Sequence, residues 1–159
     1  MEKKPNDYQP GGKHYEVQKG IDQHWDFMDR WDVGCLEYAA TKYIERIGKG
    51  KGTDLLDCQK ARHYVEKILH EHTTNGRPPR RYVPDRPIAK YAREHKLNGR
   101  QVVFYNKLLQ WRTAADLQTV IAVTEQIEKE LRAQPADSEE RRIDNTGQKH
   151  PFGFAADEE

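Results

Sequence analysis

A short loop at residues 48–53 carries the residues best suited to bind a negatively charged ligand. Glycine occupies every second position from residue 48 to residue 52, lysine lies between, and predicted helices flank the loop. Glycines let main-chain amides turn toward one point, and a helix start adds unpaired N–H groups and a positive dipole end. A flexible turn with solvated lysines has the same spacing, so that alternative stays open. The residues that we predict to bind an oxyanion are Gly48, Lys49, Gly50, Lys51, Gly52 and Thr53, with Thr53 as the N-cap of the next helix.

The loop differs from the phosphate-binding loop that is common among nucleotide-binding enzymes. The spacing G-x-x-x-x-G-K-[S/T] is absent from the sequence, and no predicted β-strand precedes the loop to hold it. The sequence therefore excludes an ordinary P-loop kinase.

Charged side chains on the two helices beside the loop form a second candidate site. Lys42 and Arg46 are four residues apart on the first helix, and Asp57, Lys60 and Tyr64 follow one another at steps of three and four on the second. If the helices pack antiparallel, the cations can bind phosphates through charge-assisted hydrogen bonds near the loop, and Asp57 can orient a cation or a metal ion. A solvated face of salt bridges is the alternative.

Carboxylates around the loop allow a further interpretation. Two aspartates after the loop and two glutamates on the preceding helix are similar to the acidic magnesium cluster of all-α nucleotide pyrophosphohydrolases. The paired E-x-x-E of those enzymes is missing here. The four residues are Asp54, Asp57, Glu37 and Glu45.

The elements that must position these residues are helices. Apolar residues recur at steps of three and four through most of the chain, and no segment has the pattern of a strand. We predict an all-α fold, a small helical bundle built from two helical hairpins. The predicted helices span residues 21–31, 35–47, 54 to about 72, 88–97, 103–111 and 114–131.

The composition along the chain predicts five segments. Residues 1–20 form an irregular arm, 21–75 the ligand-binding helical domain, and 88–133 a C-terminal helical hairpin. Between the two helical parts, residues 76–87 hold four of the eight prolines and a net charge of +3, which predicts a semi-rigid basic linker. Residues 134–159 have little to bury and carry seven acids against three bases, which predicts a disordered acidic tail.

The overall composition excludes several classes of protein. No apolar run approaches the ~20 residues that span a bilayer, and the polar N-terminus predicts no secretory signal, so we expect a cytoplasmic protein. Cys35 and Cys58 make neither a metal quartet nor a disulfide framework, and we expect both thiols to be free and buried. The tail is at −4 and the other 133 residues at +5, which suits a phosphate-bearing partner and makes nucleic acid an unlikely one. The low apolar content predicts a homo-oligomer.

Taken together, the spaced motifs of the N-terminal half resemble those of a known family. The chain is similar over about residues 13–72 to the SaV-like bacteriophage nucleotide kinases, the family of the podophage deoxynucleoside monophosphate kinase. One position differs, since the family usually has Gly-Asn where this chain has Tyr38-Ala39. The matching motifs are His14-Tyr15, Lys42-Tyr43-x-x-Arg46, Gly48-Lys49 and Asp57-x-x-Lys60-Ala61-x-x-Tyr64.

The resemblance implies phosphoryl transfer from ATP or another nucleoside triphosphate to a deoxynucleoside monophosphate, with Mg²⁺, in a homo-oligomer of the phage-infected cell's cytoplasm. Arg46 and Lys60 would then neutralise the charge that develops on the transferred group. Asp57 would bind Mg²⁺ or position the acceptor, while His14 and Tyr15 would close the site from the arm. Lys42, Tyr64 and the loop would bind the nucleotide.

Two other functions stay open for this sequence. The first is a non-catalytic module that binds nucleotides, or binds a host protein through its C-terminal half. The basic linker, the acidic tail and the Tyr38-Ala39 difference favour it. The second is the all-α nucleotide pyrophosphohydrolase that the four carboxylates suggest.

Overall fold

The computed structural model describes residues 20–80 and 85–135, and within them it contains six α-helices and no strand. This confirms the predicted all-α fold. Most of the predicted arm, with His14 and Tyr15, and nearly all of the predicted tail lie outside the described residues. The helices are α1 (His24–Arg30), α2 (Cys35–Arg46), α3 (Asp54–Asn75), α4 (Asp85–Glu94), α5 (Gly99–Leu109) and α6 (Ala114–Ala133).

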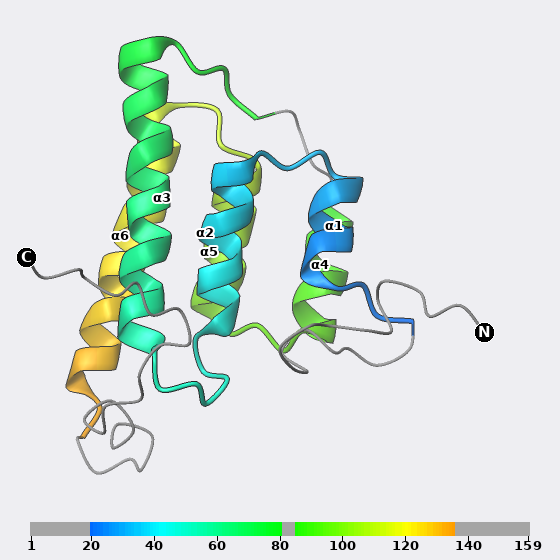
Figure 1. The fold of residues 1–159 in the computed structure, drawn as a ribbon, viewed down its shortest axis with the longest axis vertical. Coiled ribbons are helices and arrows are strands. Elements are labelled where there is room, and N and C mark those ends of the chain that lie inside the picture. The colour runs from blue at the N-terminus through cyan, green and yellow to red at the C-terminus, as the bar shows by residue number, and fades with distance from the viewer. Residues whose placement is uncertain (1–19, 81–84, 136–159) are drawn as a thin grey trace, which may run out of the picture.

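The helices lie in two layers of three. In Figure 1, α1, α2 and α3 form the front layer, and α4, α5 and α6 lie behind them. Within the layers α2 packs against α1 and α3, and α5 packs against α4 and α6; across the layers α3 packs on α6 and α2 on α5. The two antiparallel hairpins, α2–α3 and α5–α6, therefore share one core, and the loop of residues 47–53 joins α2 to α3 at one end of the molecule.

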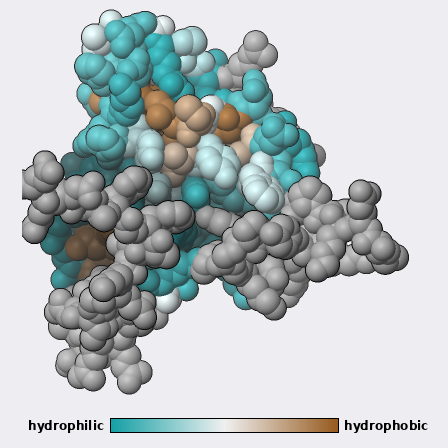
Figure 2. Space-filling model, viewed as in Figure 1, coloured by the Kyte–Doolittle hydropathy of each residue, from teal (hydrophilic) through white to brown (hydrophobic). Residues whose placement is uncertain are grey.

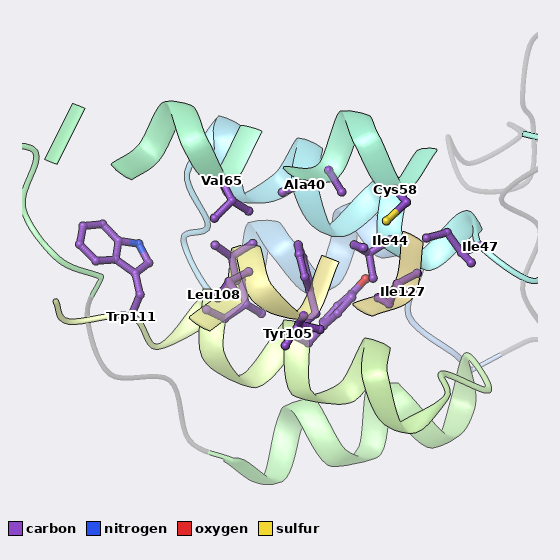
Figure 3. Close-up of a cluster of buried hydrophobic side chains, with 14 of the residues drawn as sticks. Ala40, Ile44, Ile47, Cys58, Val65, Tyr105, Leu108, Trp111 and Ile127 are labelled. Carbon is purple, nitrogen blue, oxygen red and sulfur yellow. The ribbon is translucent and has the colours of Figure 1, made fainter. Parts of the chain in front are cut away.

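The core is built around the buried stripe of α3. Cys58, Ala61, Val65 and Ile68, at steps of three, four and three, are all fully buried, because these steps place them on one face of a helix. Figure 3 shows side chains of α2 and α3 on one side of the core and side chains of α5 on the other. Its labelled residues are Ala40, Ile44, Ile47, Cys58, Val65, Tyr105, Leu108, Trp111 and Ile127.

The two cysteines differ in their environment. Cys58 is buried, donates to the carbonyl oxygen of Thr124 at 3.2 Å, and has its thiol pKa raised to about 11 by burial. Cys35 is exposed at the first position of α2. The expectation of two buried thiols is therefore confirmed for Cys58 and wrong for Cys35. Among the described residues, no helix has both the length and the apolar character of a membrane-spanning segment.

The described part of the predicted linker is held against the helices. Arg77 places one terminal nitrogen 2.8 and 3.0 Å from the two carboxylate oxygens of buried Glu37 on α2. Arg80 donates to the carbonyl oxygens of Trp31 and Asp32, which follow α1. The segment 76–80 is thus a strap across the connection between α1 and α2.

Candidate functional site

The glycine-lysine loop has an alternating backbone. Gly48, Gly50 and Gly52 have φ of 82°, 68° and 69°, in the left-handed region that favours glycine, and neither lysine between them has a positive φ. Alternation of this kind turns successive N–H groups toward one side and makes an anion-binding concavity. The amides of Gly50, Lys51 and Gly52 have no hydrogen-bond partner within the described part of the chain. As far as the described residues go, three main-chain donors are therefore left for a ligand or for water.

The first turn of α3 adds further main-chain donors. Thr53 occupies the predicted N-cap position, but its side chain makes no capping bond; its hydroxyl instead donates to Asp57 Oδ2 at 2.8 Å. Asp54 Oδ2 accepts from the Gly48 amide at 3.0 Å, while its Oδ1 is buried without a hydrogen-bond partner. The positive dipole end of a 22-residue helix therefore lies beside the loop without a side-chain cap.

Arg46 reaches this end of α3 from the last turn of α2. Its Nε lies 3.5 Å from Asp57 Oδ2; the Asp57 side chain is 2% exposed and that of Arg46 is 29% exposed. No hydrogen bond of the Arg46 guanidinium is formed within the described residues, and its Nε is buried. Every other half-buried arginine whose side chain is described is bonded: Arg62 to Glu128, Arg77 to Glu37, and Arg80 to two carbonyl oxygens.

Lys60 and Arg46 approach the same aromatic ring, although they come from different helices. The ring of Tyr43 on α2 has Lys60 Nζ at 5.1 Å and the Arg46 guanidinium carbon at 5.7 Å from its centroid. Tyr64 on α3 stacks on Tyr43 with 6.0 Å between the centroids and 11° between the planes. Both predicted cations are therefore on one side of the hairpin, around one aromatic ring.

The two lysines of the loop have different partners. Lys49 Nζ lies 3.3 Å from Glu45 Oε1, one turn back on α2. The half-buried Lys51 makes no ion pair within the described residues. Its pKa is lowered by burial and by the charges of Arg46 and Lys49, against the opposing effect of Asp57. Lys51 thus lies in the positive field of the other cations and is available to an anion.

Glu45 links the loop to the centre of the bundle. Its Oε2 accepts from the hydroxyls of Tyr91 on α4 and Tyr105 on α5, each at 2.7 Å, and its Oε1 lies 3.0 Å from His95 Nδ1. Burial would raise the pKa of this carboxyl, but the hydrogen bond from His95, the nearby positive charges and the Tyr105 hydroxyl lower it overall. The pairing of Glu45 with Lys49 follows from their i, i+4 spacing, whereas its aromatic and histidine partners come from distant segments and had no local signal.

The remaining predicted residues are Lys42 on α2 and two that lie outside the described part of the chain. Lys42 is half-buried on α2, and its charge helps to lower the pKa of buried His24, for which burial is the main cause. Tyr38, at the position that differs from the phage family, packs edge-on against His24 with 4.8 Å between ring centroids. His14 and Tyr15 are not among the described residues.

The four carboxylates of the pyrophosphohydrolase interpretation do not gather. The buried carboxylate of Glu37 contacts the Arg77 guanidinium and the Trp111 indole nitrogen. The carboxylate of Glu45 accepts hydrogen bonds from Tyr91 and Tyr105. Of the four, Asp54 and Asp57 lie in the first turn of α3, and Glu45 reaches the loop through its ion pair with Lys49. In the described ranges, no group of three His, Cys, Asp or Glu side chains could hold a metal ion.

The surface of the α2–α3 hairpin is divided by polarity. On the face shown in Figure 2, hydrophobic side chains gather near the start of α2 and the neighbouring part of α3, and a second hydrophobic patch is visible at the lower left. The charged loop is at the opposite end of the hairpin. The candidate site is thus a polar region at one end of two packed helices.

Comparisons with known proteins assign no family to the chain. No protein-family model, no curated protein and no solved structure matches it. The chemistry of the loop, Arg46 and Lys60 is therefore the basis on which function can be inferred.

Proposed function

We propose that this protein binds nucleotides at the α2–α3 loop and acts as a deoxynucleoside monophosphate kinase without a Walker motif. The observation that carries the proposal is Arg46, which is half-buried at the loop, 3.5 Å from Asp57, with no hydrogen bond to the described residues. A guanidinium group that has no hydrogen-bond partner is suited to phosphate oxygens, because it can bind two of them through parallel N–H donors. The resemblance to the phage nucleotide kinases points to the same ligand class.

In the proposed reaction, a phosphate oxygen of the monophosphate attacks the terminal phosphorus of the triphosphate. The bond from that phosphorus to the bridging oxygen breaks, and the products are two nucleoside diphosphates. Arg46, Lys51 and Lys60 would neutralise the charge on the transferred group, and the loop amides would hold the non-bridging oxygens. Positioning and charge stabilisation of this kind are most of what phosphoryl transfer requires from a protein.

Magnesium would enter this site with the triphosphate. Mg²⁺ commonly binds one or two carboxylates together with substrate phosphates, rather than a cage of protein ligands. The carboxylates at the loop are Asp54 and Asp57, and the buried Oδ1 of Asp54 lacks a partner. Asp57, the predicted metal ligand, is already paired with Arg46 and Thr53, so its first role in the proposal is to orient Arg46. The ion would supply further neutralisation of phosphate charge.

Binding and turnover test the proposal separately. Isothermal titration with dTMP and dGMP should give saturable binding, and a coupled assay with ATP and Mg²⁺ should show kinase turnover. Lys60→Ala should lower kcat/KM about 100-fold, because removal of one donor to a developing negative charge has an effect of this order. Lys67→Ala is the matched control, since Lys67 is on the same helix and pairs with Glu71. Full turnover by Lys60→Ala would remove this residue from the mechanism.

A non-catalytic nucleotide-binding module is the second candidate. It is favoured by the burial of Asp57, whose carboxylate is already paired with Arg46 and Thr53 and is therefore not free to act on an acceptor. Magnesium-dependent loss of ATP in the presence of deoxynucleoside monophosphates would decide against it. Release of pyrophosphate from a triphosphate alone would instead support the pyrophosphohydrolase. A homo-oligomer and a host partner for the C-terminal half stay predictions.

A further inference from the structure

Tyr43 on α2 is the aromatic residue that both cations of the candidate site approach. Its ring lies close to two cations, Arg46 from its own helix and Lys60 from the facing helix. Neither cation makes a hydrogen bond to a carboxylate within the described residues, and Asp57 Oδ2 lies 3.5 Å from Arg46 Nε. The face of an aromatic ring attracts cations because its π-electrons are negative there. Tyr43 is therefore the group that the two cations have in common.

Two neighbouring positive charges repel each other when no ligand is bound. Lysine and arginine side chains also have many rotamers, and ordering them costs entropy each time an anion binds. A ring that attracts both cations offsets part of the repulsion and restricts both side chains. A site in which this order exists before binding has a higher affinity, since less order must be imposed by the ligand.

The ring of Tyr43 is itself held from the other helix. Tyr64 stacks on it almost in parallel, so one ring from α2 and one from α3 fix each other across the hairpin. The hydroxyl of Tyr43 makes no hydrogen bond within the described part of the chain. The ring, and not the hydroxyl, is thus the part of Tyr43 that the local geometry uses.

We propose that Tyr43 is a positioning residue of this site, whose ring holds Arg46 and Lys60 side by side before a phosphate-bearing ligand binds. The inference rests on the proposed function in one respect, namely that the site binds phosphate. It adds a residue whose role is indirect: Tyr43 acts through the two cations, and the aromatic ring alone is needed for that role.

The test measures pyrophosphate binding by isothermal titration for matched variants. Tyr43→Leu removes the ring and should weaken binding about tenfold, whereas Tyr43→Phe keeps the ring and should bind within about twofold of the wild type. Tyr38→Leu is the control, because Tyr38 is also a half-buried tyrosine of α2 but contacts His24 and neither cation. Thermal unfolding of each variant reports whether the fold is intact.

A double-mutant cycle distinguishes positioning from a general structural effect. If Tyr43 acts through Lys60, then Tyr43→Leu should have a smaller effect in a Lys60→Gln background than in the wild type. If Tyr43→Leu does not fold, Tyr64→Leu, which removes only the supporting ring, should still weaken binding, while Tyr38→Leu does not.

The outcomes separate this inference from the proposed function. A wild-type protein that binds neither pyrophosphate nor nucleotides would overturn the proposed function. Two results would overturn the role of Tyr43 and leave the proposed function standing. In the first, the wild type binds strongly and the Tyr43→Leu variant binds with the same affinity. In the second, Tyr43→Leu weakens binding as much in the Lys60→Gln background as in the wild type.

Discussion

At the start of α2, Gly34 is required by the space around it. A Cβ atom on Gly34 would lie 2.6 Å from Glu37 Oε2 and 3.1 Å from a terminal nitrogen of Arg77. These two atoms belong to the buried ion pair that attaches the strap of residues 76–80 to α2. The absence of a side chain at position 34 therefore lets the carboxylate, the guanidinium and the helix start approach one another.

We predict that Gly34→Ala lowers the free energy of unfolding by about 2–3 kcal/mol. The added methyl group must displace a buried carboxylate from its partner, and a buried charge that loses its partner is costly. Urea denaturation measures the change. Gly99→Ala is the control, since Gly99 is also at a helix start and a Cβ there would meet no atom within 4 Å. Equal stability of the two variants would show that the space around Gly34 is not restrictive.

At this same scale, the sequence predicts the residues of the loop better than it predicts their partners. The cations of the loop region are close along the chain, so glycine spacing and helical periodicity were enough to predict that they share one site. They are Arg46, Lys49 and Lys51. Apart from Lys49, the partners of Glu37 and Glu45 come from α4, α5, the residues just after these helices, and the strap, and a single sequence contains no local signal for such contacts. The predicted carboxylate cluster failed to form for this reason.

At the scale of elements, a side chain of α5 supplies hydrogen bonds to the C-terminal end of α2, where the loop begins. The side-chain amide of Gln101 donates to the carbonyl oxygens of Ile44 at 2.8 Å and Ile47 at 3.1 Å. Gln101 is itself held by a capping box with Asn98 at the start of α5. The last carbonyl groups of a helix need such partners, and here another helix supplies one.

We predict that Gln101→Ala destabilises the protein by about 1–3 kcal/mol, because two buried carbonyl groups lose their donor. The amides of the loop after Ile47 should also exchange hydrogen faster, which mass spectrometry can measure by peptide. Gln118→Ala, at an exposed position of α6, is the control and should change stability by less than about 0.5 kcal/mol. Equal exchange in both variants would contradict the role of Gln101.

Apolar spacing was largely enough to predict the helices, and the main difference between prediction and structure is at the start of α4. We predicted a helix from residue 88, whereas α4 begins at Asp85, so that Pro87 lies in its first turn. Proline was expected to exclude a helix here. The first N–H groups of a helix have no intrahelical partner, so a proline in the first turn breaks no hydrogen bond.

At the scale of the whole molecule, buried titratable groups couple stability to pH. His24 is buried, with Nε2 at 2.9 Å from Thr41 Oγ1 and Nδ1 without a partner. Burial is the main cause that lowers its pKa from 6.5 to about 4. Between these two values the unfolded chain binds a proton that the folded chain does not bind. Stability from this group is therefore present above pH 6.5 and is lost as the pH falls toward 4.

We predict that the free energy of unfolding falls by up to about 3 kcal/mol between pH 6.5 and pH 4 because of His24. Urea denaturation at a series of pH values measures the loss. His24→Gln should flatten the curve from pH 6.5 to pH 4.5, since glutamine can keep the bond to Thr41 and does not titrate. Below pH 4.5 both proteins should lose stability because the pKa of Glu45 is lowered in the folded protein, so the unfolded chain binds a proton at this residue that the folded chain does not. The same slope in both proteins above pH 4.5 would contradict this.

The strap of residues 76–80 also limits how the bundle can move. A separation of α3 from α2 would have to break the contact of Arg77 with Glu37, and a movement of α1 would have to release Arg80 from the residues that follow it. The described part of the predicted linker thus ties the three front helices together, while the core that α3 shares with α6 joins this layer to the rear helices. Among the described residues, the glycine loop and its lysines are therefore the part that can rearrange around a bound nucleotide while the three front helices keep their relative positions.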